Sequence, residues 1–435
     1  MTNPKTTSRR DFLKFCSSAG LGVAMPFASP TLLHGKTKIS APYEGPYYVV
    51  FNASGGWDTT YLMDPKGVNE INRLYKAGDI QTHGAHKFAP TAAHIEIGMS
   101  NETFFKAYGD ELLVFNGLDY SINNHSPCKR YMATGKLDSL SYPTFAALVA
   151  ACRGPETPLA FLTFGNYSAT GNLVPMARIP YLSSLKFIAA ADSIKGISRL
   201  PYHDDFAQDL IEKTLDERSK APLMTGQLPR AERAQSMLYA AQSNSKALKR
   251  AIPFISDKDP EGGRLPRQAE IALSCFKAGV CVSANLSITQ FDSHAKNDRD
   301  QMKLIPEFLS GIDYLIKRSE ELGMREKLVI IVQSEMGRTP HYNKGDGKDH
   351  WSIGSIMFMG RGINGNRVIG ATDEKQFLKP INPKSLAVDE KSGIRTRPEH
   401  IHQALRELAG IEDHPFSKKY PLKITDTEKL HNFFG

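Results

Sequence analysis

Four short polar clusters each carry side chains that can bind a cation or move a proton. They are Gly55-Gly56-Trp57-Asp58, Phe291-Asp292-Ser293-His294, Ser334-Glu335-Met336-Gly337-Arg338 and Asp349-His350-Trp351. Carboxylates combined with one or two imidazoles are a donor set that divalent cations use in proteins. We therefore predict one divalent metal ion, Zn, Ca, Mg or Mn, and the predicted ligands are Asp58, Asp292, His294, Glu335 and His350.

Asp58 and His350 also have an ordinary structural explanation, and Glu335 is expected to need a partner. Asp58 follows two glycines and could cap a turn or a helix. Glu335 ends an apolar run, where burial of a carboxylate without a partner is costly. His350 follows a glycine-containing loop and could be a solvated loop residue. From the spacing alone, both explanations remain open for Asp58 and His350.

A further group, Asn124-His125-Ser126-Pro127-Cys128-Lys129-Arg130, leads into a helical pattern. Pro127 suits the first position of a helix, and a hydroxyl at a helix start lies near backbone amides that stabilise an anion. Ser126 is therefore a candidate nucleophile, with a helix N-cap as the alternative. Lys129 and Arg338 are candidates for holding an anionic substrate.

Short apolar runs alternate along the chain with helical patterns. The predicted strands are Tyr47 to Ala53, Leu112 to Asn116, Leu159 to Phe164, Val280 to Thr289, Leu328 to Gln333 and Ile353 to Met359. The predicted helices are Glu102 to Tyr108, Tyr142 to Cys152, Asp205 to Ser219, Arg230 to Arg250, Arg267 to Ala278, Asp300 to Leu322 and Glu399 to Leu408.

This alternation predicts an α/β fold, a doubly wound and mostly parallel sheet with helices on both faces. A helical insertion is expected at about residues 195–265, where no strand pattern occurs. In such a sheet, functional residues collect beyond the carboxyl ends of the strands. The four polar clusters are therefore expected to converge at one edge of the sheet.

The N-terminal segment Ser8-Arg9-Arg10-Asp11-Phe12-Leu13-Lys14 resembles a twin-arginine export signal. Residues 1–41 are accordingly expected to be a signal peptide with a linker, and residues 42–435 a single domain. This resemblance implies the twin-arginine translocase as a partner during export, and a periplasmic or secreted location.

Composition excludes two classes of protein. The net charge of +8 includes +3 from residues 1–35, so too little positive charge remains for a nucleic-acid-binding surface. No apolar stretch reaches about 18 residues, so the mature chain is not expected to span a membrane. The four cysteines that follow the signal, Cys128, Cys152, Cys275 and Cys281, are interpreted mainly as small buried hydrophobic residues.

The clusters at Gly55, Phe291, Ser334 and Asp349, together with Gly362-Ile363-Asn364-Gly365 and Gly370-Ala371-Thr372-Asp373, resemble the bacterial family called domain of unknown function 1501. The resemblance runs from about residue 47 to 412. That family is similar in turn to the alkaline phosphatase and sulfatase superfamily, whose members hold one or two divalent metals at the strand ends of a doubly wound sheet.

By this resemblance, Asp58, Asp292, His294, Glu335 and His350 match metal ligands of the superfamily and Ser126 matches its nucleophile. Met336 stands where the superfamily has a histidine, which makes a second metal doubtful. The sulfatase signature around the nucleophile is also missing.

The leading hypothesis is an exported, metal-dependent hydrolase of this superfamily that acts on a small anionic phosphate or sulfate ester. The first alternative is a non-catalytic periplasmic binding or assembly protein on the same scaffold. A second alternative is a polysaccharide-associated protein that uses Trp57 and Trp351 as stacking platforms, although both could be core aromatics.

Overall fold

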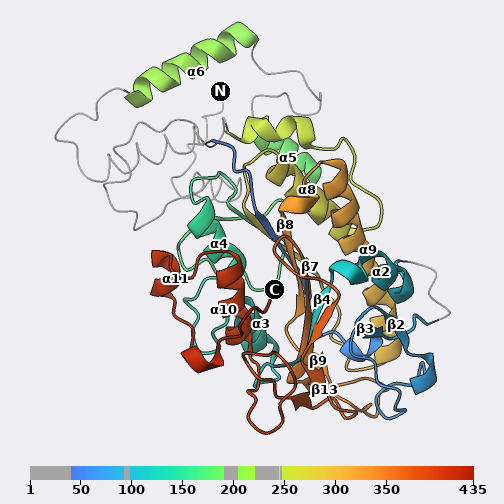
Figure 1. Ribbon diagram of the computed structural model, residues 1–435. Coiled ribbons are helices and arrows are strands. Elements are labelled where there is room, and N and C mark those ends of the chain that lie inside the picture. Colours follow the sequence, from blue (N-terminus) through green and yellow to red (C-terminus); the bar gives the residue numbers. More distant parts are fainter. Residues whose placement is uncertain (1–40, 93–97, 191–203, 221–243, 245–246) are drawn as a thin grey trace, which may run out of the picture.

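An eight-stranded mixed sheet runs through the centre of the protein (Figure 1). The computed structural model describes residues 41–92, 98–190, 204–220, 244 and 247–435. In spatial order the strands are β12 (Arg367–Ile369), β4 (Leu113–Asp119), β11 (Ile353–Gly360), β8 (Leu328–Ser334), β1 (Tyr47–Ala53), β7 (Ser283–Ile288), β5 (Phe161–Thr163) and β6 (Met176–Ala177). Only β11 runs antiparallel to its neighbours, so the sheet is mostly parallel, as predicted.

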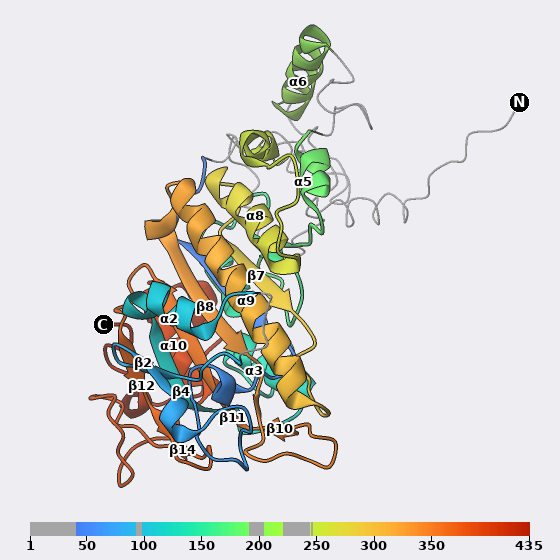
Figure 2. The same cartoon turned by 90° about the vertical axis from the view of Figure 1, so that its right-hand side faces the viewer.

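Helices cover both faces of this sheet, in agreement with the predicted fold class (Figures 1 and 2). One face packs against α2 (Asn101–Tyr108), α8 (Arg264–Lys277) and α9 (Asn297–Glu321). The other packs against α3 (His125–Thr134), α4 (Phe145–Arg153) and α10 (Pro398–Leu408). Each face therefore has its own apolar core.

The other described elements are shorter or lie outside these layers. They are α5 (Leu182–Ala189), α6 (Asp205–Lys220), α11 (Pro415–Lys419), the strand pairs β2 (Gln81–His83) with β3 (His86–Phe88), β9 (Gly337–Arg338) with β10 (His350–Trp351) and β13 (Ala371–Thr372) with β14 (Leu378–Lys379), and the 3-10 turns η2 (Thr59–Tyr61), η3 (Ala77–Asp79), η4 (Gly109–Glu111), η5 (Lys249–Phe254), η6 (Arg325–Lys327) and η7 (Asp426–Glu428). No helix in the described ranges is long and apolar enough to cross a membrane.

The three central strands end together. Ala53 at the end of β1 pairs with Ile288 of β7 on one side and with Ser334 of β8 on the other. All residues of these strands are buried, because both faces of the sheet are covered by helices. Chain segments that leave β1, β7 and β8 therefore emerge side by side.

The predicted strands all lie on observed ones, and β1 has the predicted bounds. Two of the eight, β6 and β12, were not predicted. The signal segment up to residue 40 and most of the predicted helix at 230–250 lie outside the described residues. Of the predicted insertion, the described parts form α6, η5 and the start of α8. Cys128, Cys275 and Cys281 are buried and Cys152 is partly buried, all as free thiols.

His402 on α10 makes stability depend on pH. Burial lowers the pKa of this imidazole from 6.5 to about 4, although its Nε2 lies 2.8 Å from the Met132 carbonyl oxygen, and Arg406 lowers the pKa further. In the unfolded chain the His402 imidazole therefore binds a proton below pH 6.5, whereas in the folded chain it binds one only below about pH 4. Stability is lost as pH falls through this window, and His402 contributes a loss of roughly 3 kcal/mol.

This loss can be measured by urea unfolding of the wild type and His402→Gln at pH 7 and pH 4.5. We expect the variant, which keeps an N–H donor but cannot take up a proton, to lose less stability between the two pH values. Equal losses in both proteins would show that His402 does not titrate as described.

Candidate metal centre

The segments that follow β1 and β7 touch one another through their backbones. Gly55 has φ +124°, and a Cβ atom at this position would lie 2.5 Å from the backbone nitrogen of Asp292. Only glycine fits such an approach, because both the conformation and the space exclude a side chain. The Gly-Gly pair of the first cluster thus serves to bring Asp292 against the end of β1.

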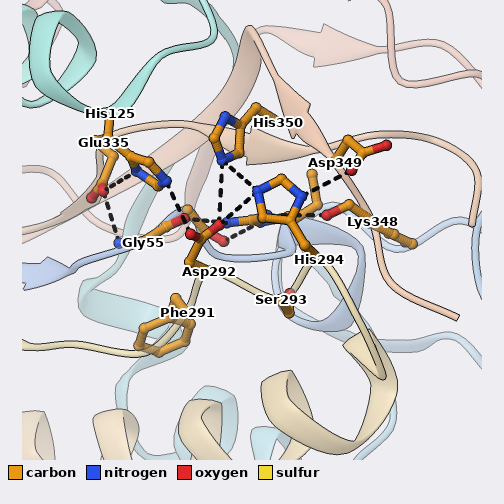
Figure 3. Close-up of polar contacts among 12 residues, drawn as sticks. Gly55, His125, Phe291, Asp292, Ser293, His294, Glu335, Lys348, Asp349 and His350 are labelled. Carbon is orange, nitrogen blue, oxygen red and sulfur yellow. Dashed lines mark hydrogen bonds and ion pairs between the residues drawn. The ribbon is translucent and has the colours of Figure 1, made fainter. Parts of the chain in front are cut away.

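Asp292, His294 and His350 meet at this edge of the sheet (Figure 3). The Nε2 atoms of the two imidazoles are 2.9 Å apart. Asp292 Oδ1 lies 3.2 Å from each of them. Three of the five predicted metal ligands therefore converge on one point, and they come from segments 56 residues apart in sequence.

The opposite nitrogen of each imidazole already has an oxygen partner. His294 Nδ1 lies 2.8 Å from Asp349 Oδ1, and His350 Nδ1 lies 2.9 Å from the Asn123 carbonyl oxygen. Both oxygens are acceptors, so each Nδ1 carries the proton and each Nε2 presents a lone pair when its ring is neutral. Two lone pairs and a carboxylate oxygen at these distances repel one another unless a proton or a metal cation lies between them.

The electrostatics of the site favour ligand atoms that carry no proton. Burial opposes ionisation of Asp292, but the ion pair with Arg338 and the contacts with His350 and His125 outweigh it and lower the pKa of Asp292 to about 2. Burial lowers the pKa of His350 below its usual value, against the contact with Asp292. At neutral pH, Asp292 is therefore ionised and His350 is neutral, as metal binding requires.

His125, the first residue of α3, joins this group and was not among the predicted ligands. Its Nε2 lies 3.2 Å from Asp292 Oδ2, and its Nδ1 lies 3.1 Å from Glu335 Oε1. Donor atoms of His125, Asp292 and His350 all lie within 4.8 Å of one another. The contact with Glu335, opposed by partial burial and aided by Asp292, raises the pKa of His125.

Glu335 contacts the nitrogen of His125 that faces away from Asp292, and the Glu335 side chain is completely buried. Oε1 accepts a hydrogen bond of 2.8 Å from the Gly55 amide and lies 3.6 Å from Lys129 Nζ. Oε2 is buried and has no hydrogen-bond partner in the described part of the chain. A buried carboxylate oxygen is costly to leave unpaired. This oxygen is therefore a further lone-pair ligand available to a metal cation.

Asp58, the fifth predicted ligand, belongs to a separate buried group. Its Oδ2 lies 2.6 Å from Lys348 Nζ and accepts a hydrogen bond from Asn297, and its Oδ1 accepts two from Thr60. Both oxygens are thus occupied by the protein itself. The carboxylate also caps the short turn η2, which was the alternative explanation from the sequence.

Arg338 has a different position from the one its predicted role requires. Its side chain is completely buried, and its guanidinium donates to the carbonyl oxygens of Gly55, Gly56 and Lys348 as well as to Asp292 Oδ1 at 2.8 Å. These partners use the guanidinium inside the protein, which leaves it unsuited to hold a substrate anion. Lys129 is about one-third exposed and remains suited to that role.

Ser126 is exposed at the second position of α3. The N-cap interpretation of Ser126 is wrong, because the helix begins at His125 and Asn124 holds the N-cap position. Pro127 is accordingly the third helical residue rather than the first. Trp57 is 1% exposed and packs edge-on against Phe308, so the proposed stacking role for this residue is also wrong.

One family model matches part of the chain. The model described as "Protein of unknown function (DUF1501)" matches residues 206–410, which confirms the predicted resemblance over that range. No curated protein matches the sequence.

Several solved structures resemble the chain at low similarity. Ps i-CgsB has 9% identity and a TM-score of 0.42, and the match covers 88% of this chain and 75% of that one. The PsFucS1 sulfatase from Pseudoalteromonas sp. has 12% identity and a TM-score of 0.38, with 86% and 69% covered. The lipoteichoic acid synthase LtaP from Listeria monocytogenes has 7% identity and a TM-score of 0.37, with 85% and 74% covered.

Proposed function

We propose that this protein is a metal-dependent hydrolase that acts on a phosphate or sulfate ester. The observation that carries the proposal is the convergence of Asp292 Oδ1 and the Nε2 atoms of His294 and His350, with both Nδ1 atoms held by oxygen acceptors. Imidazole ligands whose second nitrogen is fixed in this way are typical of metal sites. Two imidazoles with one carboxylate favour Zn²⁺ or another transition-metal ion over Ca²⁺ and Mg²⁺.

The exposure of the ligands supports a catalytic ion rather than a closed structural one. The side chains of His294 and Asp292 are 46% and 42% exposed, so a position on the ion is left for water or substrate. A divalent cation held by Asp292, His294 and His350 would act as a Lewis acid on an ester oxygen and would lower the pKa of a bound water.

Residues of α3 complete the proposed site. Lys129 is placed to attract the anionic group of the ester, and Ser126 lies in the same first helical turn as His125. His125, held between Asp292 and Glu335, can carry a proton next to the metal ligands. Ser126 or a water is the nucleophile, and Ser126→Ala separates the two. We further propose that the chain is exported by the twin-arginine pathway, on the basis of residues 8–14.

The test measures hydrolysis and metal dependence together. Purified protein is stripped with a chelator, reloaded with Zn²⁺ or Mn²⁺, and assayed on p-nitrophenyl phosphate, bis-p-nitrophenyl phosphate and p-nitrophenyl sulfate. We expect hydrolysis of at least one ester that is lost on chelation, restored by metal and abolished in Asp292→Asn, because this change removes the charge that attracts the ion.

His431→Ala is the matched control, since His431 is an exposed histidine in the C-terminal tail and should leave hydrolysis unchanged. Metal binding without turnover of any ester would favour the alternative, a non-catalytic periplasmic binding or assembly protein. Hydrolysis that survives chelation would contradict the metal-dependent mechanism.

A further inference from the structure

A buried ion pair next to the candidate metal centre contains Asp58, the predicted ligand that does not join the converging donor atoms. Lys348 Nζ and Asp58 Oδ2 are 2.6 Å apart, and both side chains have no exposed surface. The ammonium group also lies 5.3 Å and 5.2 Å from the ring centroids of Tyr61 and Tyr342, within the range of a cation–π contact. A charge buried this completely is retained only at a cost, so its position needs a reason.

The partners of this pair come from both segments that carry the converging ligands and from the turn that follows β1. Lys348 immediately precedes Asp349 and His350 in sequence. Asp58 follows the Gly-Gly turn that approaches Asp292. Asn297, which donates to Asp58 Oδ2 at 2.9 Å, begins α9 directly after the segment that carries Asp292 and His294.

Backbone contacts of Lys348 connect the pair to the ligands. The Lys348 amide donates to the Ser293 carbonyl oxygen at 3.0 Å, and Ser293 lies between Asp292 and His294. The Lys348 carbonyl oxygen accepts a hydrogen bond of 3.0 Å from Arg338, which also binds Asp292. The Lys348 side chain thus fixes a stretch of backbone that is linked twice to the Asp292 segment, directly through Ser293 and indirectly through Arg338.

A second set of hydrogen bonds links Ser293, in the Asp292 segment, to the residues around Asp58. Ser293 Oγ donates to Asn297 Oδ1 at 2.6 Å, and Gln301 bonds to Ser293 Oγ and to the Asp58 amide. All of these groups are buried. Movement of the ammonium group would therefore shift the segments of Asp292, His294 and His350 relative to one another.

We propose that Lys348 is a positioning residue, whose ion pair with Asp58 sets the spacing of His350 and Asp349 from Asp292 and His294 and thereby sets the affinity for the metal ion. This inference rests on the metal-binding part of the proposed function. It gives Asp58 a part in the metal centre without contact to the ion. The ammonium group acts through the peptide chain, as residues that orient ligands do in metal sites.

The experiment compares Lys348→Met with Lys66→Met, a matched control. Lys66 forms a second buried ion pair, 2.9 Å from Asp64, with side chains 7% and 8% exposed, and neither residue contacts a proposed ligand. The probe is Co²⁺, whose visible absorption spectrum reports the geometry of its ligands. Titration of each folded variant gives the dissociation constant and the spectrum.

We expect Lys348→Met to weaken Co²⁺ binding about 10- to 100-fold and to change the spectrum, by analogy with loss of groups that orient metal ligands. Lys66→Met should lose stability but keep the affinity within about twofold and the spectrum unchanged. If Lys348→Met does not fold, Asp58→Asn/Lys348→Met removes both charges, leaves no unpaired buried ion, and should weaken binding in the same way.

The outcomes separate this inference from the proposed function. Wild-type affinity and spectrum in a folded Lys348 variant would overturn the positioning role while leaving the metal site in place. An equal loss of affinity in Lys66→Met would also overturn it, because the effect would then follow stability alone. Failure of the wild type to bind Co²⁺ would overturn the metal site itself.

Discussion

Replacing Arg338 with methionine is expected to lower the free energy of unfolding by about 3 kcal/mol, because each buried acceptor left without a donor costs about 1–3 kcal/mol. The guanidinium satisfies the carbonyl oxygens of Gly55, Gly56 and Lys348 and neutralises Asp292. Methionine fills similar space but removes this donor from all four groups, and the Gly56 carbonyl oxygen keeps only a long hydrogen bond of 3.4 Å from Gln301. Urea or thermal unfolding of the metal-free protein measures the effect.

Two further variants sharpen this prediction. Arg299→Met is the control, because Arg299 is 65% exposed and should change stability by less than about 0.5 kcal/mol. Arg338→Lys should recover only part of the loss, since an ammonium group cannot reproduce the planar set of donors. A stable Arg338→Met protein with weakened substrate binding would instead support the anion-holding role predicted from the sequence.

The double variant His294→Ala/His350→Ala is expected to abolish stabilisation by metal. An ion that binds only the folded state at 1,000 times its dissociation constant adds about 4 kcal/mol to the free energy of unfolding. The wild type should gain this amount in Zn²⁺. The variant should gain almost none, because only Asp292 remains of the three converging donors.

Unfolding in urea with and without Zn²⁺, with the free ion held by a metal buffer, measures this difference. His341→Ala/His431→Ala removes two exposed histidines and should keep the full stabilisation. Equal stabilisation of all three proteins by Zn²⁺ would show that the ion binds elsewhere.

The fold could largely be predicted because β1 and β8 are mainly apolar runs and lie between helical patterns. β1 and β8 are buried on both faces, and such strands carry a strong sequence signal. β6 and β12 were missed because each has only two or three residues, too few for a period to emerge. The reversed direction of β11 has no signal in its own composition.

Strand-end placement predicted the meeting of Asp292, His294 and His350. The first two follow the parallel strand β7, and His350 precedes β11, whose antiparallel direction brings its start to the same edge. His125 was missed although it lies next to Ser126. The available signal was an imidazole at the start of a helix that follows β4, and the neighbouring hydroxyl matched the nucleophile position of the resembling superfamily.

Asp58 and Arg338 were assigned to the right region and the wrong partners. A sequence reveals that a carboxylate follows a strand, but it does not reveal which cation meets it. Here the cation is the ammonium group of Lys348, 290 residues away in sequence. Similarly, the three carbonyl oxygens that occupy Arg338 belong to backbone whose direction depends on the complete fold.

The open rim around Asp292 and His294 has a consequence for how the proposed metal ion would reach its site. Because almost half of each side chain faces solvent, an ion can enter or leave without any unfolding of the chain. Occupancy would then follow the free metal concentration of the surroundings, so loading could take place after synthesis is complete. Preparations made in citrate or phosphate buffers would lose the metal ion. Reloading should take seconds and should not require denaturation and renaturation.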